Sequence, residues 1–213
     1  MNIALIGASG FIGSALRDEA LSRGHTVTAV VSNPGRLAAA RDDMKVAKAD
    51  VLDTASLSDV LRGHDAVVSA FSGHAQADVY GYYVRGIASI VAATIQAAVP
   101  RLLVVGGAGS LEVAPGRRLL DTPDFPEDRK ASAEGAARAL ELLRNETTLD
   151  WTMLSPSAQL EAGKRTGRYR LGADTLLVDA EGRSRISVED YAKAMIDELE
   201  QPAHSRRRFT VGY

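Results

Sequence analysis

Short apolar runs alternate with longer amphipathic segments along the whole chain. Continuous or β-branched apolar runs predict buried strands, which fall at residues 3–6, 26–31, 44–49, 65–71, 101–105, 150–154 and 208–211. Apolar residues at helical spacing predict the helices between them, at residues 14–23, 36–41, 56–62, 79–98, 129–144 and 188–200. Because strand and helix alternate from end to end, we expect an α/β fold, a doubly wound parallel sheet with right-handed crossovers.

Capping and breaking residues set several of these boundaries. Gly24 is typical of a helix C-terminus, and Pro100 would stop the helix that precedes it. Ser56 and Ser187 are expected to cap the N-termini of the helices that follow them.

Two segments lack a regular pattern. Residues 112–128 are rich in proline and charge and predict a long loop. Residues 158–185 are polar and irregular, with a strand expected at 175–178. Loops of this length inside a compact domain are usually functional. The apolar strand 65–71 is expected to lie in the middle of the sheet.

Composition narrows the class of protein. Of the 213 residues, 46% are hydrophobic and 24% are charged, and the net charge is −2, which gives no electrostatic case for nucleic acid or an anionic membrane. The absence of cysteine excludes disulfides and thiolate chemistry. The longest apolar-rich run, 86–99, is too short to span a bilayer. With a strand at the start of the chain in place of a signal peptide, we expect a cytoplasmic protein.

The first strand runs straight into three glycines spaced three apart, followed at once by a helix. Such a turn presents free backbone N–H groups and the positive end of the helix dipole to a pyrophosphate. In a dinucleotide site the first glycine makes the turn, the second admits the phosphate and the third packs helix on strand. The expected binding residues are Gly7, Ser9, Gly10, Phe11, Ile12 and Gly13. An ordinary strand-to-helix turn, or a site for another nucleotide-bearing ligand, remains the alternative.

In a doubly wound sheet the ligand lies at the carboxyl ends of the strands. The second strand ends in Val31-Ser32, without the acidic residue that would accept hydrogen bonds from a ribose 2′-OH. Ser32 and Arg36 could instead hold a 2′-phosphate, which favours NADP over NAD. The alternative for Arg36 is a solvated helix residue.

The remaining loops at this edge supply further candidates. Asp50 and Val51 could meet the adenine, although a capped loop is an open alternative. The strand that ends at Ala70, Phe71 and Ser72 has small residues there that let the backbone lie along the cofactor ribose, and Gly107 is a further candidate for cofactor binding.

Candidate substrate residues follow the later strands. Ser110 could orient the carboxamide or the substrate and is the candidate catalytic residue, or it could be a serine in a glycine-rich turn. His74, Ser155 and Pro156 are candidates for substrate contact, with a surface histidine as the alternative for His74. The other histidines, His25, His64 and His204, lack companions at metal-ligand spacing, so no metal site is expected.

The sequence resembles the atypical short-chain dehydrogenase/reductase group with an NAD(P)H-binding domain, whose members are described as NADH-flavin reductases. Five stretches carry the resemblance: 7–13, 50–53, 105–111, 154–157 and 186–192. It implies a Rossmann fold with a small C-terminal substrate-covering part. We therefore expect one NAD(P)-binding domain over residues 1–213, with a substrate-side insertion at 155–187. It also implies NADPH or NADH as ligand and flavin- or quinone-like acceptors.

The sequence lacks one motif of the wider superfamily, and its absence favours some reactions over others. That superfamily carries Tyr-x-x-x-Lys, in which lysine lowers the pKa of a tyrosine that exchanges a proton with a carbonyl or alcohol. Here Pro126 stands four residues before Lys130, and no lysine of the chain has tyrosine in that place. Reducing a ketone leaves a strongly basic alkoxide, whereas reducing a flavin or quinone leaves a delocalised anion that solvent can protonate. Alignment of nicotinamide and acceptor can then suffice.

Three functions follow from these observations. The first is an NAD(P)H-dependent reductase of a conjugated small-molecule acceptor, with FMN or FAD among the candidate substrates and Arg165 and Arg168 as candidate phosphate ligands. The second is a redox sensor that binds the dinucleotide without turnover. The third, a sugar-nucleotide epimerase or dehydratase, is disfavoured by the missing tyrosine and the short C-terminal part. The oligomeric state stays open, a homodimer being one option.

Overall fold

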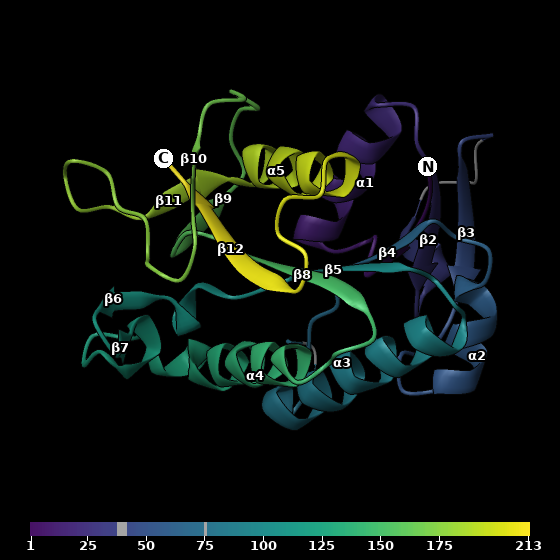
Figure 1. Cartoon of the computed structure of the whole chain (residues 1–213), viewed down its shortest axis with the longest axis horizontal. Coiled ribbons are helices and arrows are strands. Elements are labelled where there is room, and N and C mark those ends of the chain that lie inside the picture. The colour runs from purple at the N-terminus through teal and green to yellow at the C-terminus, as the bar shows by residue number, and fades with distance from the viewer. Residues whose placement is uncertain (38–41, 75) are drawn as a thin grey trace.

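The computed structural model describes residues 1–37, 42–74 and 76–213 and places one eight-stranded sheet at the centre (Figure 1). Across the sheet the order is β10-β12-β8-β5-β4-β1-β2-β3. Neighbouring strands are parallel except for β10, which is antiparallel to β12. The strands are β1 (Asn2–Ile6), β2 (Thr26–Val31), β3 (Met44–Lys48), β4 (Ala66–Ser69), β5 (Arg101–Val105), β8 (Asp150–Ser155), β10 (Arg170–Gly172) and β12 (Arg207–Gly212).

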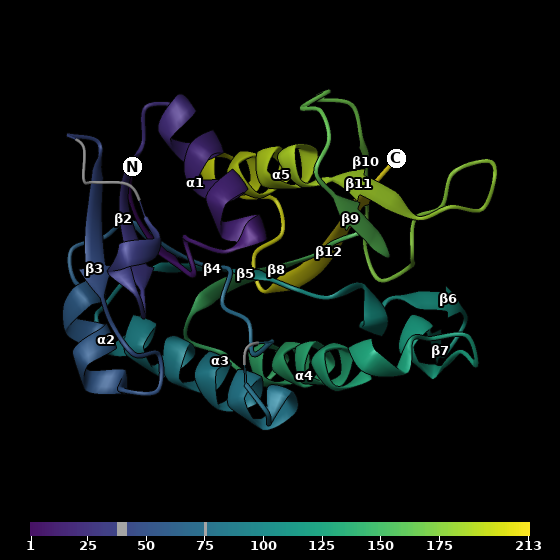
Figure 2. The ribbon, with the colours of Figure 1, turned by 180° about the vertical axis from the view of Figure 1, so that it is seen from behind.

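Helices cover both faces of the sheet, as Figures 1 and 2 show from opposite sides. One face carries α1 (Phe11–Ser22) and α5 (Val188–Glu200). The other carries α2 (Thr54–Leu61), α3 (Val79–Gln96) and α4 (Glu127–Arg144). The expected doubly wound α/β fold is confirmed, with β4 inside the sheet between β1 and β5.

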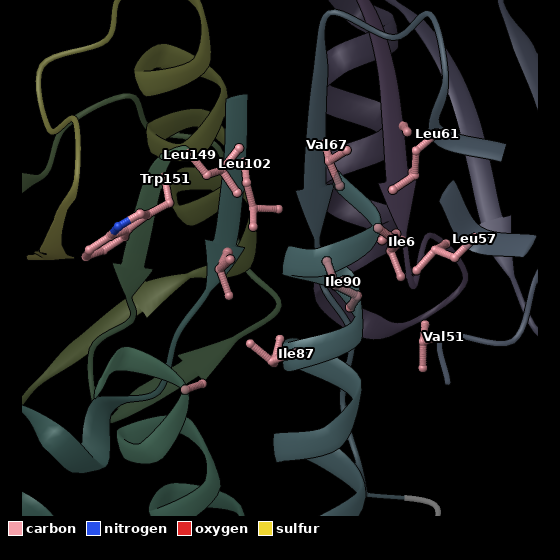
Figure 3. Close-up of a cluster of buried hydrophobic side chains, with 14 of the residues drawn as sticks. Ile6, Val51, Leu57, Leu61, Val67, Ile87, Ile90, Leu102, Leu149 and Trp151 are labelled. Atoms are coloured by element: carbon pink, nitrogen blue, oxygen red, sulfur yellow. The ribbon is translucent and has the colours of Figure 1, made fainter. Parts of the chain in front are cut away.

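A separate apolar core holds each helical layer to the sheet. Under α2, α3 and α4, the strand residues Val67, Leu102 and Trp151 pack against Leu57 and Ile90, all of them fully buried (Figure 3). The opposite core joins strand residues to α1 and α5. Strands that are buried on both faces read as continuous apolar runs, which is why the sheet is visible in the sequence.

Small elements occupy the two segments that lack a sequence pattern. Residues 112–128, expected as a loop, contain the antiparallel hairpin β6 (Glu112–Ala114) and β7 (Arg117–Arg118), and α4 already begins at Glu127. The second segment holds β10 and the parallel pair β9 (Gln159–Glu161) and β11 (Arg185–Ser187). The strand expected at 175–178 is wrong: Thr175 makes only an isolated bridge to Glu112.

The ends of three helices differ from those expected from the sequence. The first helix begins at Phe11, since the glycine turn leads directly into it. Asp53, not Ser56, caps α2, and its carboxylate accepts the Ser56 N–H. The helix α3 ends at Gln96, and Ala98 takes a positive φ before Pro100 is reached.

The helix expected at 36–41 is wrong where the structure describes it. A short 3-10 helix covers Pro34–Arg36, and Leu37 is extended. Residues 38–41 lie outside the described residues. The cap assigned to Ser187 is confirmed, because its hydroxyl accepts the Asp190 N–H.

One crossover departs from the expected common hand. The chain advances from β8 to β12 in the same direction as from β4 to β5, yet α5 lies on the opposite face from α3. The connection through α5 is therefore opposite in hand to those through α1, α3 and α4. The segment 156–187 carries the chain to the other face at the carboxyl edge before α5 begins, which allows this exception.

Among the residues described, no helix has both the length and the apolar character needed to cross a membrane.

Candidate functional site

The glycine turn joins β1 to α1 by backbone contacts that exclude side chains. Gly7 has a φ of +79°, and a Cβ there would lie 2.6 Å from the carbonyl oxygen of Ala70 at the end of β4. A Cβ on Gly13 would lie 2.1 Å from the carbonyl oxygen of Gly7. Only glycine fits at these two positions, so the start of α1 is held against the ends of β1 and β4.

Gly10 differs from these two because it faces outward. It is the exposed N-cap of α1, in extended backbone that any residue adopts, and a Cβ would meet only the carbonyl oxygen of Gly7 at 3.4 Å. No described group accepts a hydrogen bond from the N–H of Phe11, Ile12 or Gly13. Free N–H groups at the positive end of a helix suit an anion, and the missing side chain leaves it room to approach.

A cavity of about 980 Å³ opens beside this turn. It runs along the carboxyl ends of β4, β5 and β8 and reaches the β6–β7 hairpin and the start of α4. Aromatic and aliphatic side chains make much of its wall, with contributions from Phe11, Phe71, Val79, Tyr83, Val105, Val113, Leu119, Phe125 and Leu160. The volume lies at the upper end of the range for small-molecule and cofactor sites.

Ten of the sequence-predicted residues line this cavity together. They come from the glycine turn, from the ends of β4 and β5 and from the loop after β8, and they are Gly10, Phe11, Ile12, Gly13, Ala70, Phe71, Ser72, His74, Gly107 and Pro156. Gly7 and Ser9 belong to the same turn without lining the cavity. The sequence therefore located one wall of the cavity, and the roles given to these residues stay predictions.

The residues predicted for the adenosine end lie at the neighbouring strand ends. The N–H of Gly7 donates to Val30 in β2, so the loop after β2 begins beside the glycine turn. Ser32 and Arg36 are exposed there, and Arg36 has no ion-pair partner among the described residues. An unpaired arginine at this edge fits the charge of a 2′-phosphate.

Asp50 and Val51 follow β3 at the same edge. Val51 is buried, and the carboxylate of Asp50 accepts the Leu52 N–H, so Asp50 has the capped-loop geometry that was its alternative. Partial burial, and then the charge of Asp50, raise the pKa of Tyr82 on α3. Neither Asp50 nor Val51 lines the cavity, so their contact with the adenine stays a prediction.

Ser110, the candidate catalytic residue, lies outside the lining of the cavity. It is 9% exposed, its Oγ accepts a hydrogen bond of 3.1 Å from Arg208 Nη1, and it is not part of the cavity lining. Arg208 in turn binds the carboxylate of Asp174. The 3-10 helix Ala108–Ser110 packs on α4, which directs Ser110 into this polar network. This geometry gives Ser110 a structural contact and does not support the catalytic role, which stays a prediction.

Of the candidate residues after β8, one lines the cavity and the others do not. Ser155 is fully buried, and its hydroxyl, which has no hydrogen-bond partner among the described residues, would lie 3.0 Å from a Cβ placed on Gly106. Pro156 faces the cavity and Ser155 does not. Arg165 is bound to Glu19 of α1 through Nε at 2.7 Å and Nη2 at 2.8 Å, and neither it nor Arg168 lines the cavity. Their assignment to an acceptor phosphate is not supported.

An aromatic pair forms the floor of the cavity: Phe71, which is a candidate from the sequence, and Tyr83, which the sequence did not single out. Phe71 stacks on Tyr83 with ring centroids 5.8 Å apart and an interplanar angle of 4°. Glycines make room for both rings: a Cβ on Gly86 would lie 2.2 Å from Phe71, and one on Gly135 would lie 3.2 Å from Tyr83. The signal was present, since these glycines interrupt two predicted helices without breaking them.

Tyr83 is the one tyrosine among the described lining residues, and its surroundings do not lower the pKa of its hydroxyl. Its hydroxyl donates to the carbonyl oxygen of Val105 at 3.4 Å. Burial raises its pKa above the ordinary tyrosine value. With no lysine in the cavity lining to stabilise a phenolate, Tyr83 stays protonated at neutral pH.

The remaining histidines are structural. His25 lies between the N-terminal amine and Glu200, His64 contacts Leu61 and Thr28, and His204 contacts Glu198 and stacks on Phe209. In the described part of the chain, no group of three or more histidine or acidic side chains could hold a metal ion.

The sheet order, the glycine turn and the cavity at the carboxyl edge together define a Rossmann-like nucleotide-binding protein. The chain belongs to the NAD(P)H-binding family, whose model matches residues 7–202.

Relatives match over nearly the full length. The Bacillus subtilis protein YwnB is 42% identical over 214 residues, covering 99% of this chain and 98% of that protein. A crystal structure from Bacteroides thetaiotaomicron, provisionally described as an epimerase, is 47% identical with a TM-score of 0.94, covering 100% of this chain and 96% of that one. Another from Streptococcus pneumoniae, provisionally described as an NADH-flavin reductase, is 36% identical with a TM-score of 0.86, covering 100% and 99%.

Gly10→Ala separates ligand binding from folding. The Cβ fits the free protein, so we expect a loss of unfolding free energy of no more than about 1 kcal/mol. If the pyrophosphate lies against Gly10, affinity for NADPH falls about tenfold or more, roughly 1.4 kcal/mol. Fluorescence titration with NADPH and urea unfolding measure the two quantities.

Gly13→Ala is the matched control, since its Cβ collides with the Gly7 carbonyl. It should cost about 3 kcal/mol of unfolding free energy, at the upper end of overpacking costs. A Gly10→Ala protein that binds NADPH like the wild type would exclude the turn as the phosphate site.

Proposed function

We propose that the protein is an NAD(P)H-dependent oxidoreductase that reduces a flat, conjugated acceptor of the flavin or quinone class. The observation that carries the proposal is the lining of the cavity at the carboxyl edge. Its wall joins the glycine turn to an aromatic floor and contains no tyrosine–lysine pair among its described residues. Family membership supports the nicotinamide part of this proposal.

The residues present fit a nicotinamide dinucleotide. The N–H groups of Phe11, Ile12 and Gly13 would hold the pyrophosphate, where Gly10 leaves space that a Cβ would fill. Ser32 and Arg36 would hold a 2′-phosphate at the end of β2. Gly106 and Gly107, at the end of β5, would border the nicotinamide. When bound, the reduced nicotinamide supplies a hydride, which is the two electrons and one of the protons that the acceptor takes up.

The chain's own contribution is alignment and exclusion of water. The stacked rings of Phe71 and Tyr83 offer a rigid apolar floor to a planar ligand. Tyr83 keeps its proton, because burial opposes its ionisation and its hydroxyl is directed at Val105. The second proton comes from solvent, which suffices for a delocalised anion and would not suffice for an alkoxide. This distinction favours a conjugated acceptor over a ketone or a sugar.

A non-catalytic redox sensor is the alternative from another class. It would use the same glycine turn and would explain the missing acid–base pair equally well. The size of the cavity favours catalysis, because it extends beyond the glycine turn to the β6–β7 hairpin and leaves room for a second ligand.

Turnover with an acceptor distinguishes the two functions. Purified protein is mixed with NADPH or NADH, with and without a flavin or a quinone, and the absorbance of the reduced nicotinamide is followed. We expect steady oxidation that requires both protein and acceptor. Tight NADPH binding without oxidation across a panel of flavins, quinones and ketones would refute the reductase and indicate a sensor.

Arg36→Ala tests the choice of cofactor. Removing the guanidinium should weaken NADPH binding about tenfold, roughly 1.4 kcal/mol, and leave NADH binding within about twofold. The control is Arg62→Ala, which removes an exposed arginine paired with Asp59 at the end of α2 and should change neither affinity. Equal loss of NADPH and NADH affinity in the Arg36 variant would contradict a 2′-phosphate role.

A further inference from the structure

Two unpaired arginines line the part of the cavity formed by the β6–β7 hairpin and the start of α4. Arg117 comes from β7 of the hairpin, and Arg129 comes from the first turn of α4. Neither guanidinium has a hydrogen bond or an ion pair with any residue that the structure describes. A cation that folding leaves without a partner beside an apolar cavity is available to a ligand.

Other arginines on the hairpin and on α4 do have acidic partners. Arg118 binds Asp121 through Nε at 2.8 Å and Nη2 at 2.9 Å, and Arg138 binds Glu141 at 2.7 Å. Both are absent from the cavity lining. Arginines that point away from the cavity are thus neutralised by acidic neighbours, whereas the two that line it are not.

The cavity has an excess of positive charge. Asp124 is the one carboxylate among its described lining residues, against the two guanidinium groups, and the other polar side chains around them are neutral ones such as Thr122, Ser132 and Gln159. Arginine presents planar N–H donors that match a carboxylate, sulfonate or phosphate. An uncharged ligand would leave these donors to water.

The hairpin that carries Arg117 is anchored to the body of the protein. Glu112 donates its N–H to the carbonyl of Asp174 at 2.8 Å and accepts the Leu176 N–H at 2.9 Å. The carboxylate of Asp174 is bound by the buried Arg208 and, at 3.2 Å, by Arg144 of α4. These bonds fix β6–β7 relative to α4, so Arg117 and Arg129 are held on one cavity.

We propose that Arg117 and Arg129 bind an acidic group on the acceptor, so that the substrate is a conjugated ring that bears a carboxylate, sulfonate or phosphate. The ring lies on the Phe71–Tyr83 floor, and the acidic group lies under the hairpin. This inference rests on the proposed function and narrows its substrate class. It also moves the acceptor's anion site from Arg165, which is bound to Glu19, to arginines that face the cavity.

Matched acceptors test the charge alone. FMN and riboflavin share one ring system and differ in the phosphate, and 1,4-naphthoquinone-2-sulfonate is compared with 2-methyl-1,4-naphthoquinone. For the wild type we expect a lower KM for the acidic member of each pair. Arg117→Ala and Arg129→Ala should each raise that KM about tenfold, as for loss of a charged hydrogen bond, and should change the KM of the neutral member less than about twofold.

Matched variants control for general charge loss. Arg118→Ala and Arg138→Ala remove paired arginines from the same hairpin and the same helix, and they should leave both KM values unchanged. All four side chains are exposed, so thermal unfolding should show intact folding in every variant. Equal effects of Arg117→Ala and Arg118→Ala on the acidic acceptors would overturn the proposal.

Equilibrium binding separates this inference from the proposed function. Calorimetric titration of FMN and riboflavin into the protein with NADP⁺ present requires no turnover. Preference for FMN that is lost in the Arg117 and Arg129 variants supports the anion site, even if no acceptor is reduced. Turnover in which acidic and neutral acceptors respond alike to all four variants would overturn the anion site and leave the reductase standing.

Discussion

The backbone of α1 lies so close to the turn after β1 that no side chain fits between them. A Cβ at Gly13 would overlap the Gly7 carbonyl, and a Cβ at Gly7 would overlap the Ala70 carbonyl. These two contacts place the positive end of α1 directly over the carboxyl edge of the sheet, beside the ends of β1 and β4. This packing of α1 on the sheet positions the proposed pyrophosphate site at the start of α1 and the part of the cavity beside Phe71.

The site is organised to align reactants more than to move protons. Its tyrosine is buried, directed at a backbone carbonyl and resistant to ionisation, and Pro126 stands where a catalytic tyrosine would be expected. The polar network of Ser110, Arg208 and Asp174 anchors the hairpin from outside the cavity, whose described lining has His74, Tyr83, Arg117, Asp124 and Arg129 as its titratable side chains. Such a cavity suits a ligand whose charge is delocalised after it accepts electrons.

Elements with a strong local pattern could be predicted from the sequence. The strands β2 and β5 and the helix α5 have the expected bounds, because β-branched runs and the Ser187 cap determine them locally. The hairpin β6–β7 and the strands β9, β10 and β11 could not be found this way. They are two or three residues long, and their existence depends on partners such as Asp174 or Tyr213 that are distant in sequence.

The residues of the candidate site also divide into those that the sequence could predict and those that depend on distant partners. The glycine turn and the ends of β4 and β5 follow from spacing, so most of the residues predicted there do meet at one cavity. Ser110, Arg165 and Arg117 are equivalent as sequence positions, namely polar residues in loops. Only the fold reveals that Arg208 binds the first, that Glu19 binds the second and that the third faces the cavity unpaired.

The most direct test of this arrangement is a crystal structure of the protein with NADPH bound. We expect the pyrophosphate on the N–H groups of Phe11, Ile12 and Gly13, the adenosine beside Ser32 and Arg36, and the nicotinamide beside Gly107 within the cavity. Nicotinamide outside the cavity, or adenine stacked on the Phe71–Tyr83 floor, would contradict it.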